Sequence, residues 1–231
     1  MRSGLLRIAA DTHRFAILLG VFLLLMLANP LFEKTLAAGF IGDTLYYLFL
    51  AAAAYSVRRS RFFKLAIILG ASVLVGEFAG YFFHQKAVLV ITTGLSSLYL
   101  LLVTVLILVN VLQQEEISAD TVLGGLCVYI MIGVLWTSLY INLVLLTPGS
   151  FDFGVHGNHS QLIGFYGLLF YYSFISLLTI GFGDVIPLSS MAQTLTIIEG
   201  LIGRFYLVFY MACLINLYIA HREKRSEKQA R

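Results

Sequence analysis

The stretch Thr179-Ile180-Gly181-Phe182-Gly183-Asp184 places two glycines, Gly181 and Gly183, on either side of one bulky apolar residue. Successive backbone carbonyls can point toward one axis only when ordinary and left-handed dihedrals alternate along the chain. Glycine adopts left-handed dihedrals at little cost because it has no Cβ. The stretch therefore predicts a ladder of carbonyl oxygens, which the hydroxyl of Thr179 continues at its inner end. A glycine-rich surface turn is the competing interpretation.

These six residues resemble the selectivity filter of tetrameric potassium channels, in the form T-[IV]-G-[YF]-G-D. In that family, rings of backbone carbonyls from several chains replace the hydration shell of K⁺. The resemblance implies that K⁺, the permeant ion, is the only ligand required and that no cofactor is needed. It also implies a homotetramer, because the chain carries one such stretch. The implied filter residues are Thr179, Ile180, Gly181, Phe182 and Gly183, with K⁺ held at the first four.

Composition indicates that the chain is embedded in a membrane. Hydrophobic residues make up 60% of it, charged residues 12%, and the mean hydropathy is +0.92, unlike a soluble domain. About 20 helical residues cross the roughly 30 Å hydrocarbon layer. We therefore expect an all-α integral membrane protein with six transmembrane helices. The predicted spans are Phe15–Phe32, Phe40–Val57, Phe62–Phe83, Ala87–Leu112, Thr121–Thr147 and Met191–Ile219.

A seventh apolar segment, Gly164–Leu178, is too short to span and leads directly into the glycine pair. We expect it to form a re-entrant pore helix followed by the filter loop. Irregular backbone at membrane depth is tolerated only where protein or a water-filled path surrounds it, and a filter meets that condition.

Basic residues gather on one side of the predicted spans. Cytoplasmic loops carry an excess of Lys and Arg, so we expect both termini in the cytoplasm and a multi-pass protein of the cell membrane. The net charge of +3 is then a topology signal and indicates no nucleic-acid partner. The residues are Arg2, Arg7, Arg14, Arg58, Arg59, Arg61, Lys64, Arg222, Lys224, Arg225, Lys228 and Arg231.

The resemblance covers roughly Thr121 to Ala220 and implies a pore domain at 121–220, after a peripheral four-helix region at 1–120 and before a basic cytoplasmic tail at 221–231. Tyr171-Tyr172-Ser173 resembles the aromatic pair that braces the filter from behind. Because Ile175 offers no carboxylate, the family pattern implies that Tyr172 bonds to Asp184 at the outer mouth. Gly203 lies at the family's inner-helix hinge position, although close helix packing explains a glycine there equally well.

A voltage sensor needs repeated basic residues on its fourth span, because only charges that cross the field can drive opening. The segment Ala87–Leu112 contains no Arg or Lys. We therefore expect a channel that is not voltage-gated, with the first four spans serving as peripheral structure or a lipid-facing module.

Ionisable residues inside predicted spans are functional candidates, because they are costly in a membrane. Three stand out: Glu77 in the third segment, and Glu199 and Arg204 in the sixth. Four arginines facing a cavity would repel K⁺, so we expect Arg204 to turn away from the axis and pair with Glu199 of its own or a neighbouring chain, or with Glu77. A gating role for Arg204 is the alternative.

The pattern favours a passive K⁺-selective channel and offers no catalytic residues, so we do not expect an enzyme. A non-selective cation channel shares the architecture, but an acidic or broken filter is typical of it. A transporter or helical scaffold explains the hydropathy and leaves the glycine pair without a purpose.

Overall fold

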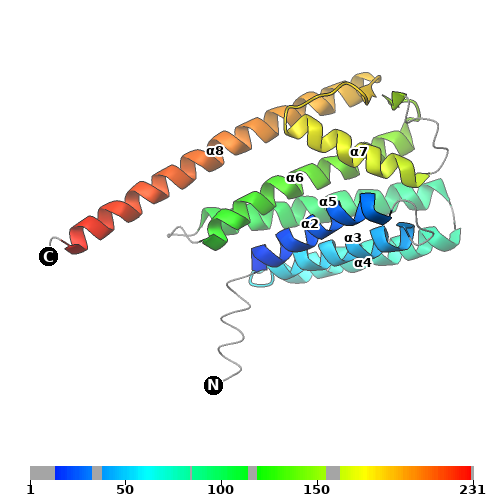
Figure 1. Ribbon diagram of the computed structural model, residues 1–231. Helices are drawn as coiled ribbons and strands as arrows, with labels where there is room; N and C mark the ends of the chain where they lie inside the picture. Colours follow the sequence, from blue (N-terminus) through cyan, green and yellow to red (C-terminus); the bar gives the residue numbers. More distant parts are fainter. Residues whose placement is uncertain (1–13, 33–37, 84, 114–118, 155–161, 230–231) are drawn as a thin grey trace. The chain divides into compact units, whose positions relative to one another are not determined.

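The computed structural model describes residues 14–32, 38–83, 85–113, 119–154 and 162–229, and helices make up nearly all of it (Figure 1). In chain order the elements are α2 (Arg14–Phe32), α3 (Ala38–Ser56), α4 (Phe63–Phe83), α5 (Lys86–Leu112), α6 (Ala119–Leu146), β1 (Phe151–Asp152), α7 (Leu162–Leu177), β2 (Ile186–Pro187) and α8 (Ser190–Gln229).

Every predicted apolar segment falls on one of these helices, with ends that agree within two residues except at the end of α8. Within the described residues, four helical segments are long and apolar enough to cross a membrane. Two further apolar helices, Arg14–Leu27 and Phe165–Leu177, are shorter. The all-α membrane fold is confirmed at this level, and the total of six spans stays a prediction. The four segments are Phe63–Gly80, Lys86–Leu112, Thr121–Leu146 and Ser190–Cys213.

Helix α8 is the one element that runs well past its predicted end. Its 40 residues correspond to about 60 Å of helix, roughly twice the hydrocarbon thickness of a bilayer. The helix continues without interruption through most of the predicted basic tail at 221–231.

The chain divides into two compact units, and the first comprises Met1–Phe63, Val105–Val128 and Val208–Arg231. Here α2 and α3 lie side by side, as Figure 1 shows, with the rings of Phe22 and Phe49 6.0 Å apart. The hydroxyl of Ser56 donates to the Arg14 carbonyl at 3.4 Å, across the open end of this pair. This helix pair forms the core of the first unit.

The start of α6 meets α8 within the same unit. Tyr210 on α8 donates its hydroxyl to the Val122 carbonyl at 2.7 Å, and its ring occupies the space that a Cβ on Gly125 would need. Gly124 similarly leaves room for the ring of Phe15. Small residues at membrane helix interfaces let two backbones approach closely, which is their role here.

The second unit comprises Lys64–Thr104 and Tyr129–Leu207 and contains the glycine-rich stretch. Polar side chains connect α5 to α6 inside it: Thr93 donates to Asn142 Oδ1 at 2.8 Å, and the hydroxyls of Ser97 and Ser138 lie 2.8 Å apart. Hydrogen bonds between helices add to van der Waals packing where both helices are apolar on all sides. They position α6, against which α7 packs.

A short β pair ties the turn after α6 to the segment after the glycine-rich stretch. Strands β1 and β2 are antiparallel, with Phe151 opposite Pro187 and Asp152 opposite Ile186. The Ser150 carbonyl also accepts from the Leu188 amide at 2.8 Å. The prediction of an all-α chain missed this pair, because strands of two residues are too short to show alternation.

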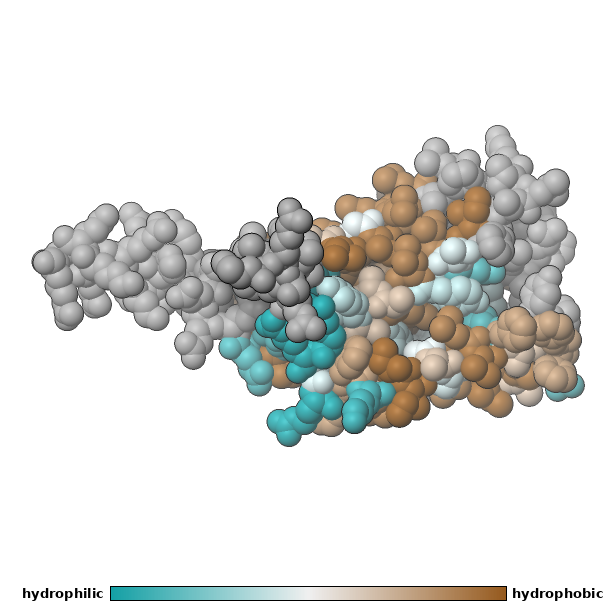
Figure 2. All heavy atoms as spheres, turned by 90° about the horizontal axis from the view of Figure 1, so that it is seen from below, coloured by the Kyte–Doolittle hydropathy of each residue, from teal (hydrophilic) through white to brown (hydrophobic). Residues whose placement is uncertain are grey.

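Apolar surface remains exposed on two of the candidate spans. Of the candidate spans, Thr121–Leu146 is 72% buried, whereas Phe63–Gly80 and Ser190–Cys213 are each 11% buried. Hydrophobic side chains also cover much of the described surface in Figure 2. Helix α6 is therefore a core helix, while α4 and α8 present faces suited to lipid or to another protein surface.

Candidate functional site

The candidate site begins where α7 ends, and a helix cap sets its geometry. The Ile180 amide donates to the Ile175 carbonyl at 2.8 Å, and the Thr179 amide donates to the Ser176 carbonyl at 3.0 Å. This pair of bonds, with a left-handed residue at Thr179, is the Schellman pattern that closes many helices. The cap leads the chain out of the helix and directly into the glycine-rich stretch.

Backbone handedness alternates along that stretch. The angle φ is +59° at Thr179, +59° at Gly181 and +78° at Gly183, and it is not positive at Ile180 or Phe182 between them. The two glycines adopt the left-handed dihedrals expected of them. Thr179 was not expected to do so, because a β-branched residue is costly in this region. The helix cap, which the sequence pattern did not reveal, accounts for it.

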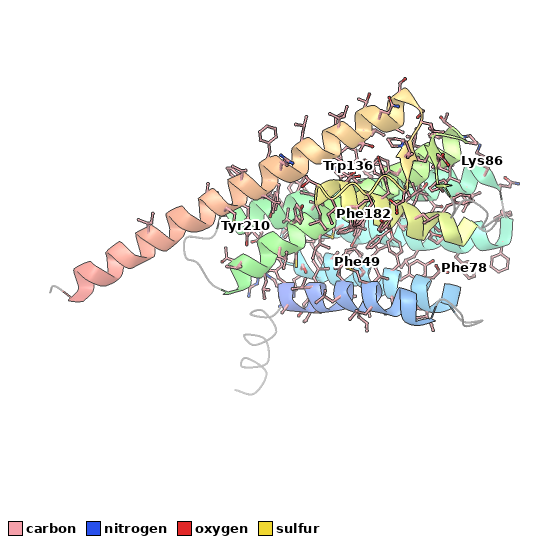
Figure 3. All side chains as sticks on the ribbon, turned by 45° about the horizontal axis from the view of Figure 1, so that its top comes forward. Phe49, Phe78, Lys86, Trp136, Phe182 and Tyr210 are labelled. Carbon is pink, nitrogen blue, oxygen red and sulfur yellow. The ribbon has the colours of Figure 1, made fainter. Side chains whose placement is uncertain are left out.

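The stretch is open in the single chain. A Cβ built on Gly181 or Gly183 meets no atom within 4 Å, and the side chains of Ile180 and Phe182 are 50% and 70% exposed. Figure 3 labels Phe182 on the extended segment between α7 and α8. Bulky apolar groups so exposed directly after a helix whose residues are buried or half-buried indicate a surface that other molecules cover.

A tyrosine of α7 holds the outer end of the stretch, and it is not the tyrosine expected. Tyr171 donates to Asp184 Oδ2 at 2.7 Å, whereas the hydroxyl of Tyr172 lies 2.7 Å from that of Thr196 on α8. The predicted bond from Tyr172 to Asp184 is therefore wrong. Consecutive helical residues point about 100° apart, so only one of the pair can face the stretch. Tyr172 instead turns its ring edge-on to Tyr140 and Phe151.

This correction yields a prediction for a pair of variants. If the stretch conducts ions, as its resemblance to a channel filter implies, we expect Tyr171→Phe to destabilise its outer end, because it removes the donor to Asp184, and to shorten conducting periods several-fold. Tyr172→Phe also removes one hydroxyl but leaves the bond to Asp184 intact, so it should change the durations much less. Single-channel recording of the three proteins measures this difference. Equal shortening by both variants would contradict the assignment of Tyr171 to the mouth.

Glu199 of α8 lies fully buried behind α7, with 0% of its surface exposed. Tyr140 on α6 donates to its Oε2 at 2.6 Å, and the hydroxyl of Ser173 on α7 lies 2.5 Å from its Oε1. One acidic side chain thus joins three helices. The sequence singled out Glu199 but not Tyr140, because the two are 59 residues apart and no local pattern links them.

Within the described chain Arg204 does not pair with Glu199, and a pair with Glu199 of a neighbouring chain stays a prediction. Residues five apart on a helix point about 140° away from each other, and Arg204 lies exposed while Glu199 is buried. Across the described parts of the chain, Arg204 forms no ion pair, with Glu77 or with any other carboxylate. The expectation that Arg204 turns away from the axis stays a prediction, because one chain by itself does not define that axis.

Gly203 packs α8 against the end of α7. It is buried, and a Cβ there would lie 2.6 Å from Leu177 Cδ1 and 3.3 Å from the Leu177 carbonyl oxygen. That same carbonyl accepts from Tyr129 at 2.9 Å. Helix α8 runs straight through this position as one element. The close-packing interpretation of Gly203 has a direct contact, and the hinge stays a prediction.

One comparison with known proteins gives a match to the region that contains this site. Residues 160–220 match a family model described as an ion channel. The matched region contains α7, the glycine-rich stretch and the apolar part of α8. Searches of the curated proteins and of the solved structures returned no significant match. The match indicates an ion channel and favours a non-enzymatic role, and the apolar helices indicate a membrane protein.

Proposed function

We propose that this protein is a potassium-selective channel that conducts K⁺ passively through Thr179, Ile180, Gly181 and Phe182. The observation that carries the proposal is the alternation of positive φ at Thr179, Gly181 and Gly183, directly after a capped helix. Alternating handedness turns successive carbonyls toward one line, which is the arrangement that replaces the hydration shell of K⁺. Ions thus pass along backbone oxygens, without a cofactor.

A complete ring of carbonyls requires more than one copy of the stretch, and we infer a homotetramer. Support comes from the single chain, in which Ile180 and Phe182 are largely exposed and no atom approaches the Cβ positions of Gly181 and Gly183. Neighbouring copies would cover these groups. The exposed apolar face of Ser190–Cys213 is long enough to contact both lipid and an adjacent copy.

The end of α7 adds electrostatic support for a cation. The aligned peptide dipoles of a helix give its C-terminal end a partial negative charge. Thr179 follows the last residue of α7, Leu177, by two positions. The helix end therefore favours positive charge at the inner side of the stretch, where Thr179 contributes its hydroxyl.

The two other function classes are less well supported. A broken or acidic filter is typical of a non-selective cation channel, whereas both glycines here adopt the left-handed dihedrals that a carbonyl ladder requires. A transporter or scaffold accounts for the apolar helices but not for the match of residues 160–220 to an ion channel model. The mass of the protein in detergent separates these classes further, because a scaffold predicts one or two chains and a channel predicts four.

The test is the reversal potential of the full-length protein in planar bilayers. With K⁺ on the cytoplasmic side and Na⁺ outside, we expect the reversal potential to follow the K⁺ gradient, since the carbonyl ladder fits a dehydrated K⁺ ion. Symmetrical K⁺ on both sides is the control and should give reversal at zero. Reversal near zero under the mixed gradient would overturn K⁺ selectivity while leaving a cation channel in place.

The same recordings test the absence of voltage gating. Helix α5 has Lys86 at its first residue and no Arg or Lys in the rest of its length. A basic residue in the field is what couples opening to voltage, so open probability should show no steep, multi-charge dependence on potential.

We further propose a cell-membrane protein with both termini cytoplasmic, in contact with membrane lipids. Protease accessibility of the two termini in sealed vesicles tests that orientation.

A further inference from the structure

Three helices of the second unit meet at one buried carboxyl group. Glu199 on α8 has one oxygen 2.6 Å from the hydroxyl of Tyr140 on α6 and the other 2.5 Å from the hydroxyl of Ser173 on α7. Ser173 Oγ is also 2.9 Å from the Gly133 carbonyl oxygen on α6, which accepts from Thr137 as well. The contacts form a chain from Tyr140 through Glu199 and Ser173 to Gly133.

Counting protons identifies the form of Glu199 that fits this chain. The chain has three contacts, Tyr140 to Glu199, Glu199 to Ser173 and Ser173 to Gly133, and each needs one proton. The hydroxyls of Tyr140 and Ser173 supply only two. If Glu199 were ionised, one pair of oxygens would face each other with no hydrogen between them. If Glu199 carries a proton, it donates to Ser173, Ser173 donates to Gly133, and every contact is a hydrogen bond.

The surroundings of the carboxyl group agree with the neutral form. Burying an ionised carboxylate without a cation is costly, and such groups neutralise instead. The titratable groups near Glu199 are tyrosines, namely Tyr129 and Tyr140 from α6 and Tyr172 from α7. The nearest cation on its own helix, Arg204, points to the exposed side. Within the described residues, no Lys, Arg or His forms an ion pair with Glu199.

We propose that Glu199 is a neutral carboxylic acid that positions α7 by donating its proton to Ser173. Loss of that proton to solvent base leaves a carboxylate that accepts from both Tyr140 and Ser173. The Ser173 hydroxyl then turns away from Gly133, and one link between α7 and α6 is lost. Ser173 lies on α7 six residues before Thr179, so loosening this helix reaches the inner end of the stretch. The effect on conduction rests on the proposed channel function, whereas the protonation state does not.

Infrared spectroscopy of the full-length protein in lipid tests the protonation state directly. At neutral pH we expect the parent protein to show the carbonyl stretching band of a protonated carboxylic acid. This band should be absent in Glu199→Gln. It should be retained in Glu77→Gln, the matched variant of the other intramembrane glutamate. Absence of the band from the parent, or its persistence in Glu199→Gln, would overturn the proposal. If Glu199→Gln does not fold, Ser173→Ala must shift the band, because it removes the acceptor of the acid's proton; an unshifted band also overturns the proposal.

Currents at neutral and alkaline pH test the positioning role. We expect the current of the parent to be roughly fivefold to tenfold smaller at alkaline than at neutral pH, the scale of one lost hydrogen bond. In Glu199→Gln this fall should disappear, because glutamine keeps an acceptor for Tyr140 and an N–H donor for Ser173 at every pH. The Glu77→Gln variant should retain it. An equal fall in the parent and in Glu199→Gln would overturn the role. A parent that passes no current at any pH would instead contradict the channel function and leave the infrared result standing.

Discussion

We expect Gly181→Ala or Gly183→Ala to abolish K⁺-selective conduction. Both glycines have positive φ, +59° and +78°, and both Cβ positions are open within the single chain, so backbone strain sets the penalty that arises inside each chain. A non-glycine residue pays about 1–2 kcal/mol in the left-handed region, or about 4–8 kcal/mol over the four chains of a tetramer. Turning a peptide unit would relieve this strain, and it would remove one ring of carbonyl oxygens from the proposed ion path.

Gly149→Ala provides a matched control for this prediction. Gly149 has φ of +84° in the turn after α6, and a Cβ there also meets no atom within 4 Å. Its replacement therefore imposes the same kind of backbone strain far along the chain from the glycine-rich stretch. Currents under a K⁺ gradient should be lost in the two filter variants and retained in Gly149→Ala. Retention of K⁺ selectivity in Gly181→Ala would contradict a carbonyl filter at this position.

The second large effect is expected at Gly203, where we expect Gly203→Ala to lower thermal stability and conduction together. The new Cβ would lie 2.6 Å from Leu177 Cδ1 and 3.3 Å from the Leu177 carbonyl oxygen. Overpacking of this kind costs about 1–3 kcal/mol for each chain. Because Leu177 ends α7, a displacement there also reaches Thr179.

Two further variants separate packing from bending at Gly203. Gly200→Ala changes a glycine of the same helix whose Cβ position is open, so it should be neutral or stabilising by up to about 1 kcal/mol. Leu177→Ala leaves a cavity of its own, because Leu177 is 1% exposed, so it serves as the background: in it Gly203→Ala should cost less stability than it costs in the parent, because the clashing side chain is gone. If Gly203 acts only in packing, conduction recovers with stability. Recovery of stability without recovery of channel opening would support the hinge.

Much of the fold could be read from local sequence, because crossing a membrane is a local requirement. A helix of about 20 apolar residues satisfies its own backbone and can be recognised without its neighbours. The ends of α4 and α5 were predicted within one residue for this reason. The left-handed dihedrals of Gly181 and Gly183 were equally accessible, since they follow from the absence of a Cβ.

Contacts between helices could not be read in the same way. A soluble helix shows its buried face as an apolar stripe, but these helices are apolar on nearly every side, so the pattern does not reveal which face turns inward. The family pattern thus assigned Tyr172 to Asp184, whereas the rotation of α7 gives that bond to Tyr171. The sequence likewise could not tell which partner Arg204 has, and the described chain shows no pair with its own Glu199 or with Glu77.

The chain by itself determined the positions of the apolar helices and the glycine-rich stretch, because lengths, charges and missing side chains act within a few residues. Tertiary structure decided what lies behind that stretch. Glu199 meets Ser173 and Tyr140, which are 26 and 59 residues away, through the packing of α6, α7 and α8. The left-handed Thr179 depends on the cap at the end of α7. Such contacts form only after the helices pack, since a buried hydroxyl or carboxyl group must then find a hydrogen-bond partner among whichever groups surround it.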